Sequence, residues 1–300
     1  MHDQQTAVTS ITAEDYRLPT TVTPDRYEIR LSPDLGSFTF AGEETVAITV
    51  HQPTAEIVLN AIELDIDRAV VERGGRRLTV TGVELDPVNE RARLRFAETL
   101  EAGPWRLTIV FRGILNDKLH GFYRSQYKDS AGQTHRVAAT QFEATDARRA
   151  FPCWDEPALK ASFKVSLVID ENLTAISNTA IESERRLGDG KKELTFKETI
   201  RMSSYLVAIV VGEFEATEAV DVDGAPLRIV HVPGKRPLTN WAREIGAFSL
   251  KFFADYYGVK YPGDKLDLIA IPDFASGAME NLGAITFRET ALLVDENSAS

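Results

Sequence analysis

The stretch Trp105-Arg106-Leu107-Thr108-Ile109-Val110-Phe111 carries a large apolar side chain at every second position. Successive side chains of a β-strand point to opposite faces, so this spacing indicates a strand with one buried face. The same alternation recurs on both sides of it, around residues 27–31, 46–50, 92–96 and 163–169. Turn residues such as Gly103-Pro104 and Asp189-Gly190 separate these runs. We therefore expect the chain from residue 15 to about residue 215 to form an antiparallel β domain.

The pattern changes after residue 215. An apolar residue then recurs at helical spacing on one face, and Gly258 is suited to end such a helix. The residues of this face are Trp241, Ile245, Phe248, Phe252 and Tyr256. Two strand-like runs follow, at 266–271 and 285–288. We predict a mainly β protein with a leader over 1–14, a β-sandwich domain over 15–215, and an unfinished α+β region over 216–300.

Composition excludes several classes of protein. The chain has 300 residues, of which 43% are hydrophobic and 26% are charged, as in ordinary globular proteins. A formal net charge of -11 disfavours binding to nucleic acid, because phosphate backbones repel an acidic chain. The lone cysteine, Cys153, permits no internal disulfide, and the polar N-terminus has no signal-peptide pattern. The longest apolar run, 205–211, is too short to span a membrane. We expect a soluble, cytoplasmic protein.

The usual catalytic patterns are missing from the sequence. A zinc site needs three or four converging ligands, often two histidines a helical turn apart. No two histidines here lie three to five residues apart; they are His2, His51, His120, His135 and His231. Cys153 lies among bulky residues without a neighbouring cation to lower its pKa, so we interpret it as a buried structural thiol.

Two segments nevertheless stand out. The segment from Gln141 to Pro157 is dense in charges and aromatic rings, and taken alone it fits either a salt-bridged loop or part of a site. The segment from Asp273 to Ala284 places small residues around a lone glutamate. It fits either a bulged strand edge with a solvated carboxylate or a backbone that a ligand approaches closely.

The second segment contains Gly277-Ala278-Met279-Glu280-Asn281, which resembles the exopeptidase motif of the aminopeptidase N family of zinc peptidases. Further stretches resemble the same family in the same order. They are Gly121-Phe122-Tyr123-Arg124-Ser125, Thr140-Gln141-Phe142-Glu143, Asp146 to Pro157, and Lys160-Ala161-Ser162-Phe163. The resemblance runs from about Tyr16 almost to the end of the chain, and the cytosolic enzymes of the puromycin-sensitive or tricorn-factor kind look most similar.

The resemblance implies an enzyme that removes single residues from the free N-terminus of peptides. In such enzymes the glutamate matched by Glu280 binds the substrate α-ammonium, helped by the glutamate matched by Glu143. By the same resemblance Gln141 hydrogen-bonds the substrate, and the backbone of Gly277 and Ala278 meets it as a strand edge. Two roles are less direct: Met279 lines the first side-chain subsite, and Asn281 holds the loop in shape.

The same resemblance implies one zinc ion in a thermolysin-like domain, of which residues 216–300 would be the first part. Its H-E-x-x-H motif is expected beyond Ser300, so we expect no zinc ligand, general base or other catalytic residue in these 300 residues, and no peptidase activity from them alone. Two alternatives remain. A non-catalytic binding or scaffold module has no use for an ammonium pocket, and an epoxide hydrolase relative fits Ala278 less well. The oligomeric state and side-chain preference stay open.

Overall fold

The alternating stretch around Trp105 forms β7 (Gly103–Ile114), which lies inside the largest sheet. The computed structural model describes residues 16–295, so the predicted leader over 1–14 lies outside the described residues. As the alternation predicts, Trp105, Leu107, Ile109 and Phe111 are all buried. Each packs into a core of apolar side chains that extends through the β domain.

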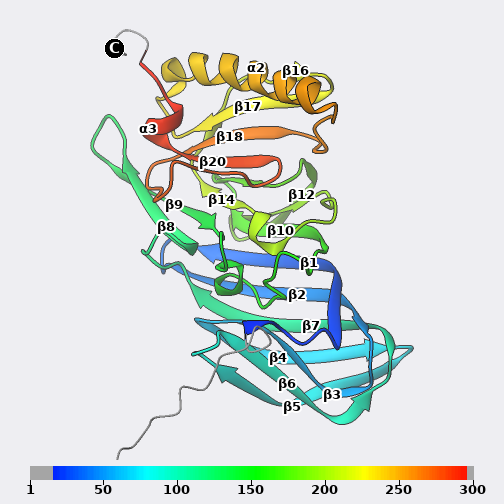
Figure 1. The fold of residues 1–300 in the computed structure, drawn as a ribbon. Coiled ribbons are helices and arrows are strands. Elements are labelled where there is room, and N and C mark those ends of the chain that lie inside the picture. The colour runs from blue at the N-terminus through cyan, green and yellow to red at the C-terminus, as the bar shows by residue number, and fades with distance from the viewer. Residues whose placement is uncertain (1–15, 296–300) are drawn as a thin grey trace, which may run out of the picture.

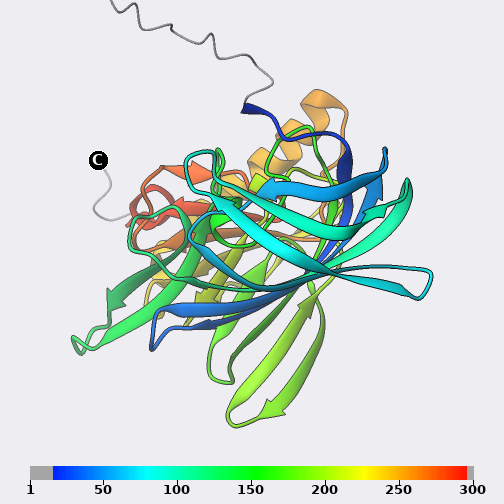
Figure 2. The ribbon, with the colours of Figure 1, turned by 90° about the horizontal axis from the view of Figure 1, so that it is seen from below.

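The largest sheet has ten strands in the order β12-β13-β10-β1-β2-β7-β4-β5-β6-β3. Neighbouring strands are antiparallel except β1 and β10, which run parallel. Figure 2 shows how strongly this sheet twists, since the yellow-green hairpin of β12 and β13 runs steeply across the cyan strands. The other nine strands are β1 (Val22–Asp34), β2 (Thr39–Val50), β3 (Thr54–Asn60), β4 (Leu64–Arg73), β5 (Arg76–Asp86), β6 (Arg91–Leu100), β10 (Ser162–Asp170), β12 (Ile181–Gly188) and β13 (Lys191–Phe196).

A four-stranded antiparallel sheet follows in the order β11-β14-β9-β8. Its strands are β8 (Gly121–Lys128), β9 (Thr134–Gln141), β11 (Thr174–Ser177) and β14 (Ile209–Gly212). Two short 3-10 helices, η1 (Ala147–Arg149) and η2 (Ser204–Leu206), lie in the connections. In Figure 1 this sheet lies between the ten-stranded sheet and the last sheet of the chain.

The last sheet runs β15-β17-β18-β20-β19, with β16 also paired to β17. The β17–β18 and β18–β20 pairs are parallel, and α2 (Asn240–Tyr257) covers the sheet face away from β14 and β9 (Figure 1). The remaining elements are β15 (Glu215–Ala216), β16 (Val220–Val222), β17 (Ala225–His231), β18 (Leu266–Ile271), β19 (Ala278–Met279), β20 (Ala284–Arg288), η3 (Arg236–Leu238) and α3 (Glu289–Leu292).

The mainly β fold with a later α+β region is confirmed. The boundary at residue 215 stays a prediction, although β14 and β15 on either side of it belong to different sheets. Helix α2 ends as predicted, at Gly258, whose φ is 67°. Among the described residues, neither helix combines the length and the apolar character that crossing a bilayer requires.

Candidate functional site

The motif segment forms the outer edge of the six-stranded sheet. β19 pairs with β20 through Ala278 opposite Phe287, and β19 is the end strand in the sheet order. The Gly277 carbonyl accepts a hydrogen bond from the Arg288 N–H at 3.0 Å. Gly277 and Ala278 are both exposed, and a Cβ at Gly277 would meet no atom within 4 Å. An extended ligand therefore has room to lie beside this backbone.

Side chains of the motif alternate between the two faces of this edge. Glu280 is exposed, and its carboxylate has no ion-pair or hydrogen-bond partner among residues 16–295. Met279 is only 1% exposed and packs in an apolar cluster. Its predicted contact with a substrate side chain stays a prediction. Asn281 is also buried, and its Nδ2 donates to Thr286 Oγ1 at 3.2 Å. The buried amide thus ties the turn after β19 to β20.

The other predicted residues stand at the end of β9. Gln141, the last residue of that strand, is 7% exposed, and its buried Oε1 has no hydrogen-bond partner in the described part of the chain. Glu143 follows two residues later, is exposed, and likewise has a carboxylate without a partner there. The Glu143–Ala144 peptide bond is cis. Gln141 and Glu143 thus offer acceptor oxygens that no donor among residues 16–295 uses.

Packing brings these two segments against each other. One apolar cluster includes Tyr123 of β8, Ala139 of β9 and Met279 of β19. At the start of the motif segment, Tyr123 Oη donates to the Asp273 carbonyl and Ser125 Oγ donates to Asp273 Oδ2, both at 2.9 Å. The β8–β9 hairpin and the motif are therefore fixed to one another.

Two buried charged side chains, Lys265 and Asp267, lie beneath the turn that follows the motif, and the partly exposed Arg228 pairs with them. Lys265 Nζ lies 2.6 Å from the Gly283 carbonyl and 2.9 Å from the Asp267 carboxylate, which itself is fully buried. Arg228 forms a double hydrogen bond to Asp267, at 2.8 and 2.9 Å. Burial lowers the pKa of Lys265, although Asp267 opposes that change. No local sequence pattern identifies this cluster, because Arg228 lies on β17, 37 residues before Lys265, and only the pairing of β17 with β18 brings it to Asp267.

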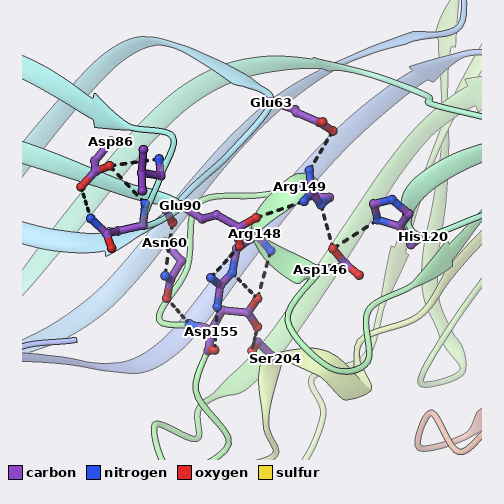
Figure 3. A network of polar contacts seen from close by, with 12 residues as sticks. Asn60, Glu63, Asp86, Glu90, His120, Asp146, Arg148, Arg149, Asp155 and Ser204 are labelled. Atoms are coloured by element: carbon purple, nitrogen blue, oxygen red, sulfur yellow. Dashed lines mark hydrogen bonds and ion pairs between the residues drawn. The ribbon is translucent and has the colours of Figure 1, made fainter. Parts of the chain in front are cut away.

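The charged segment around Arg148 proves to be a salt-bridged loop. Arg148 Nε lies 3.0 Å from Asp155 Oδ2, and Arg148 Nη1 lies 3.0 Å from Glu90 (Figure 3). Ser204 Oγ donates to the other oxygen of Asp155 at 2.5 Å. Cys153 in the same loop is fully buried, as predicted, and burial raises the pKa of its thiol.

The neighbouring arginine is paired in the same way. Arg149 contacts Asp146 at 2.7 Å, Glu63 at 3.0 Å and Glu90 at 3.1 Å, and His120 lies 3.2 Å from Asp146 (Figure 3). Asp146 and Asp155 of this segment therefore pair with arginines and hold the loop, whereas Glu143 has no such partner among residues 16–295.

Residues 16–295 hold no group of three or more histidine, cysteine, aspartate or glutamate side chains placed to bind a metal ion. The donors that zinc requires do not converge anywhere in that range. The described residues therefore do not fit a zinc ion, and we assign none of them to metal chemistry.

Known proteins match nearly the whole chain. The description "Peptidase M1 N-terminal domain" matches residues 23–206, and "Peptidase family M1 domain" matches residues 241–300. Aminopeptidase M1-C of Oryza sativa subsp. japonica is 46% identical over 95% of this chain and 32% of its own length. The puromycin-sensitive aminopeptidase of Caenorhabditis elegans is 41% identical over 95% of this chain and 30% of its own length.

Endoplasmic reticulum aminopeptidase 1 of Rattus norvegicus is 38% identical over 95% of this chain and 31% of its own length. The chain thus spans about a third of the length of the curated relatives it matches. Because the first of the two matching descriptions covers 23–206, well over half of the 300 residues, and the relatives agree with it, this chain belongs to peptidase family M1.

Proposed function

We propose that this chain is the N-terminal part of a zinc aminopeptidase, and that it supplies the anchor for the substrate α-ammonium. The observation that carries the proposal is the exposed carboxylate of Glu280, which directly follows the edge strand β19 and has no partner among residues 16–295. Membership of a family whose relatives are named aminopeptidases supports it.

The number of free acceptors supports an ammonium ligand. An ammonium group has three donors and is costly to remove from water without acceptors and opposite charge. Glu280, Glu143 and Gln141 Oε1 together offer three acceptor groups, none of which has a partner among residues 16–295. An internal peptide nitrogen carries no charge, so such an anchor favours a free N-terminus over an internal bond.

The free edge of β19 supports an extended peptide as the substrate. A peptide that adds a strand there would exchange backbone hydrogen bonds with Gly277 and Ala278, whose small side chains leave room for the approach. Zinc, when bound in the whole enzyme, would supply the metal chemistry of hydrolysis. Its ligands would come from residues other than the described ones.

The test uses the full-length protein and an aminoacyl-arylamide. Each of Glu280→Ala and Glu143→Ala removes a charged hydrogen-bond acceptor, worth about 1.5–3 kcal/mol, so KM should rise about ten- to a hundredfold. Glu184→Ala is the control, because Glu184 is an exposed glutamate on β12 and should leave KM unchanged. An unaltered KM in both anchor variants would contradict the assignment.

A second measurement separates the enzyme from a non-catalytic binding module. The full-length protein should contain bound zinc and release arylamine, whereas a protein with neither property would be the binding module instead. The 300-residue chain alone, supplied with zinc, should release none, since the described residues offer no metal site. Turnover by the purified chain would refute that part of the proposal.

We also propose the cytoplasm as its location, on the support of a single cysteine in 300 residues. Because one relative is named for the endoplasmic reticulum, the location needs its own test. Fractionation of cells that express the tagged full-length protein should recover it in the cytosolic fraction. Recovery with a membrane-bound compartment would refute this location.

A further inference from the structure

Asn178 lies directly after β11, 2% exposed, and has no part in the predicted site. Its Nδ2 donates to two carbonyl oxygens, that of Leu206 at 2.7 Å and that of Leu282 at 2.8 Å. Its Oδ1 accepts a hydrogen bond from the Ala208 N–H at 3.0 Å. Both donors of the amide are thus used, and one of them holds the residue that follows Glu280-Asn281.

The chain next to Leu282 is fitted closely to Asn178. Gly283 has φ 75°, and a Cβ on it would lie 1.8 Å from the Asn178 carbonyl oxygen. A side chain at this position is therefore excluded by both conformation and space. Lys265, the residue before β18, donates through Nζ to the Gly283 carbonyl. The turn after the motif is held by backbone and side chains together.

The same asparagine connects to the other half of the site. Ala208, which it binds, is followed by Ile209, whose N–H donates to Thr140 Oγ1 at 2.9 Å. Thr140 precedes Gln141 in β9, and Glu143 lies two residues after Gln141. A continuous series of short contacts therefore runs from Leu282 through Asn178 to the strand that ends at Gln141.

We propose that Asn178 is a positioning residue that sets the spacing between Glu280 and Glu143, and thereby the affinity for an ammonium group. The inference rests on the function proposed above. Asn178 does not touch the substrate; it acts by fixing Leu282 to the β domain. An amide is required, because an aspartate would turn a carboxylate oxygen toward the carbonyls of Leu206 and Leu282 and offer them no donor.

Binding of two small probes tests this without depending on turnover. Isothermal titration calorimetry on the zinc-stripped full-length protein compares leucine amide, which has a charged amine, with N-acetyl-leucine amide, which has none. Asn178→Asp should lower the preference for the charged amine about tenfold, which corresponds to the loss of one good charged hydrogen bond. On the zinc-loaded enzyme, KM should rise by a similar factor with little change in kcat.

A double-mutant cycle separates positioning from general damage. If Asn178 acts through the anchor, Asn178→Asp should have no further effect on probe preference once Glu280→Gln is present. Independent, additive losses would refute the inference. Should Asn178→Asp fold poorly, Asn178→Ser removes the carboxamide without adding a charge, and the same cycle applies to it.

Thr199→Val is the matched control. Thr199 is also buried and bonds backbone groups, accepting from the Phe163 N–H at 2.9 Å, but it holds β10 rather than the motif. It should lower the melting temperature and leave probe preference unchanged. If Asn178→Asp does only the same, its role is purely structural and the inference is wrong. If Glu280→Gln itself leaves probe preference unchanged, the proposed anchor fails, and the inference fails with it.

Discussion

Glu44 is a carboxylic acid in the middle of an apolar core. It lies in β2 on the inward face with Val46 and Ile48, it is fully buried, and neither carboxylate oxygen has a partner among the described residues. Burial alone raises its pKa well above the ordinary range. The period of two predicts which face position 44 occupies. It does not predict a glutamate there, because charged residues are almost never buried without a partner.

Glu44→Gln should stabilise the protein increasingly as the pH rises. In the folded state Glu44 stays protonated, whereas in the unfolded chain it ionises near its ordinary pKa. The contribution of Glu44 to the free energy of unfolding is therefore most favourable below the pKa of the unfolded chain. It is lost as the pH rises from that pKa toward the higher pKa of the folded state. Glutamine does not ionise, so its advantage in the free energy of unfolding should grow by about 1.4 kcal/mol per pH unit above about pH 5.

Urea unfolding at pH 5, 6, 7 and 8 measures this effect. Glu43→Gln is the matched control, because Glu43 is the adjacent residue and faces solvent. Its effect should be small and the same at each pH. A difference between wild type and Glu44→Gln that does not vary with pH would mean that Glu44 is ionised inside the folded protein.

At the scale of elements, α2 shows what periodicity leaves undecided. The helix was predicted, with its aromatic stripe and its end at Gly258, and the structure confirms all three. The stripe, however, faces away from the sheet: Trp241 is 52% exposed and Phe248 62%. The face that packs on the sheet includes the small residues Ala242 and Gly246, together with Leu250. Periodicity identifies an apolar face, but it cannot say which of two faces a neighbour covers.

Gly246→Val should therefore destabilise the protein more than a change in the aromatic stripe. A Cβ at Gly246 would lie 2.8 Å from Leu268 Cδ1, and overpacking of this kind costs about 1–3 kcal/mol. Trp241→Gln alters a half-exposed side chain and should cost less than about 1 kcal/mol. Urea unfolding followed by circular dichroism compares the two variants, and a larger loss in Trp241→Gln would show that the aromatic stripe is the packed face.

For the strands, too, the sequence pattern predicts some features and leaves others undecided. Alternating runs around 27–31, 46–50, 92–96, 105–111 and 163–169 all lie in strands, because each has one buried face. Alternation fixes faces rather than partners, so it did not predict that β1 pairs with β10 in parallel. β12 has no inward face to detect, since all of its residues are exposed.

At the scale of the whole molecule, the candidate site depends on contacts between distant segments. The motif residues are adjacent in the chain, so the sequence could identify them. Asn178 lies about a hundred residues earlier and gives no local signal, because only the fold brings it to Leu282. What remained beyond prediction was therefore the support of the site rather than its proposed acceptors.

β18 joins the two parts of the molecule because both of its faces are buried. Leu266, Leu268 and Ala270 belong to the apolar cluster that includes the Ala242 face of α2. Ile269 and Ile271 belong to the other cluster, together with β8, β9 and β14 side chains. In Figure 1 this strand accordingly lies between α2 and the four-stranded sheet. A cavity on one face of β18 should thus destabilise different neighbouring elements from a cavity on the other face.

Ile271→Ala and Leu268→Ala test this division. Each deletes a buried aliphatic side chain, at a cost of about 2–5 kcal/mol, but on opposite faces of one strand. Ile271→Ala should speed amide hydrogen exchange in β8 and β9 as well as in β18 and β20, because its cluster crosses between the sheets. Leu268→Ala should speed exchange in α2, β17 and β18 while β8 and β9 stay protected. Equal exchange rates in β8 and β9 for the two variants would contradict this division. They would mean that the protein unfolds as one unit, and that the apolar cluster beneath the motif does not by itself fix the β8–β9 hairpin to the motif.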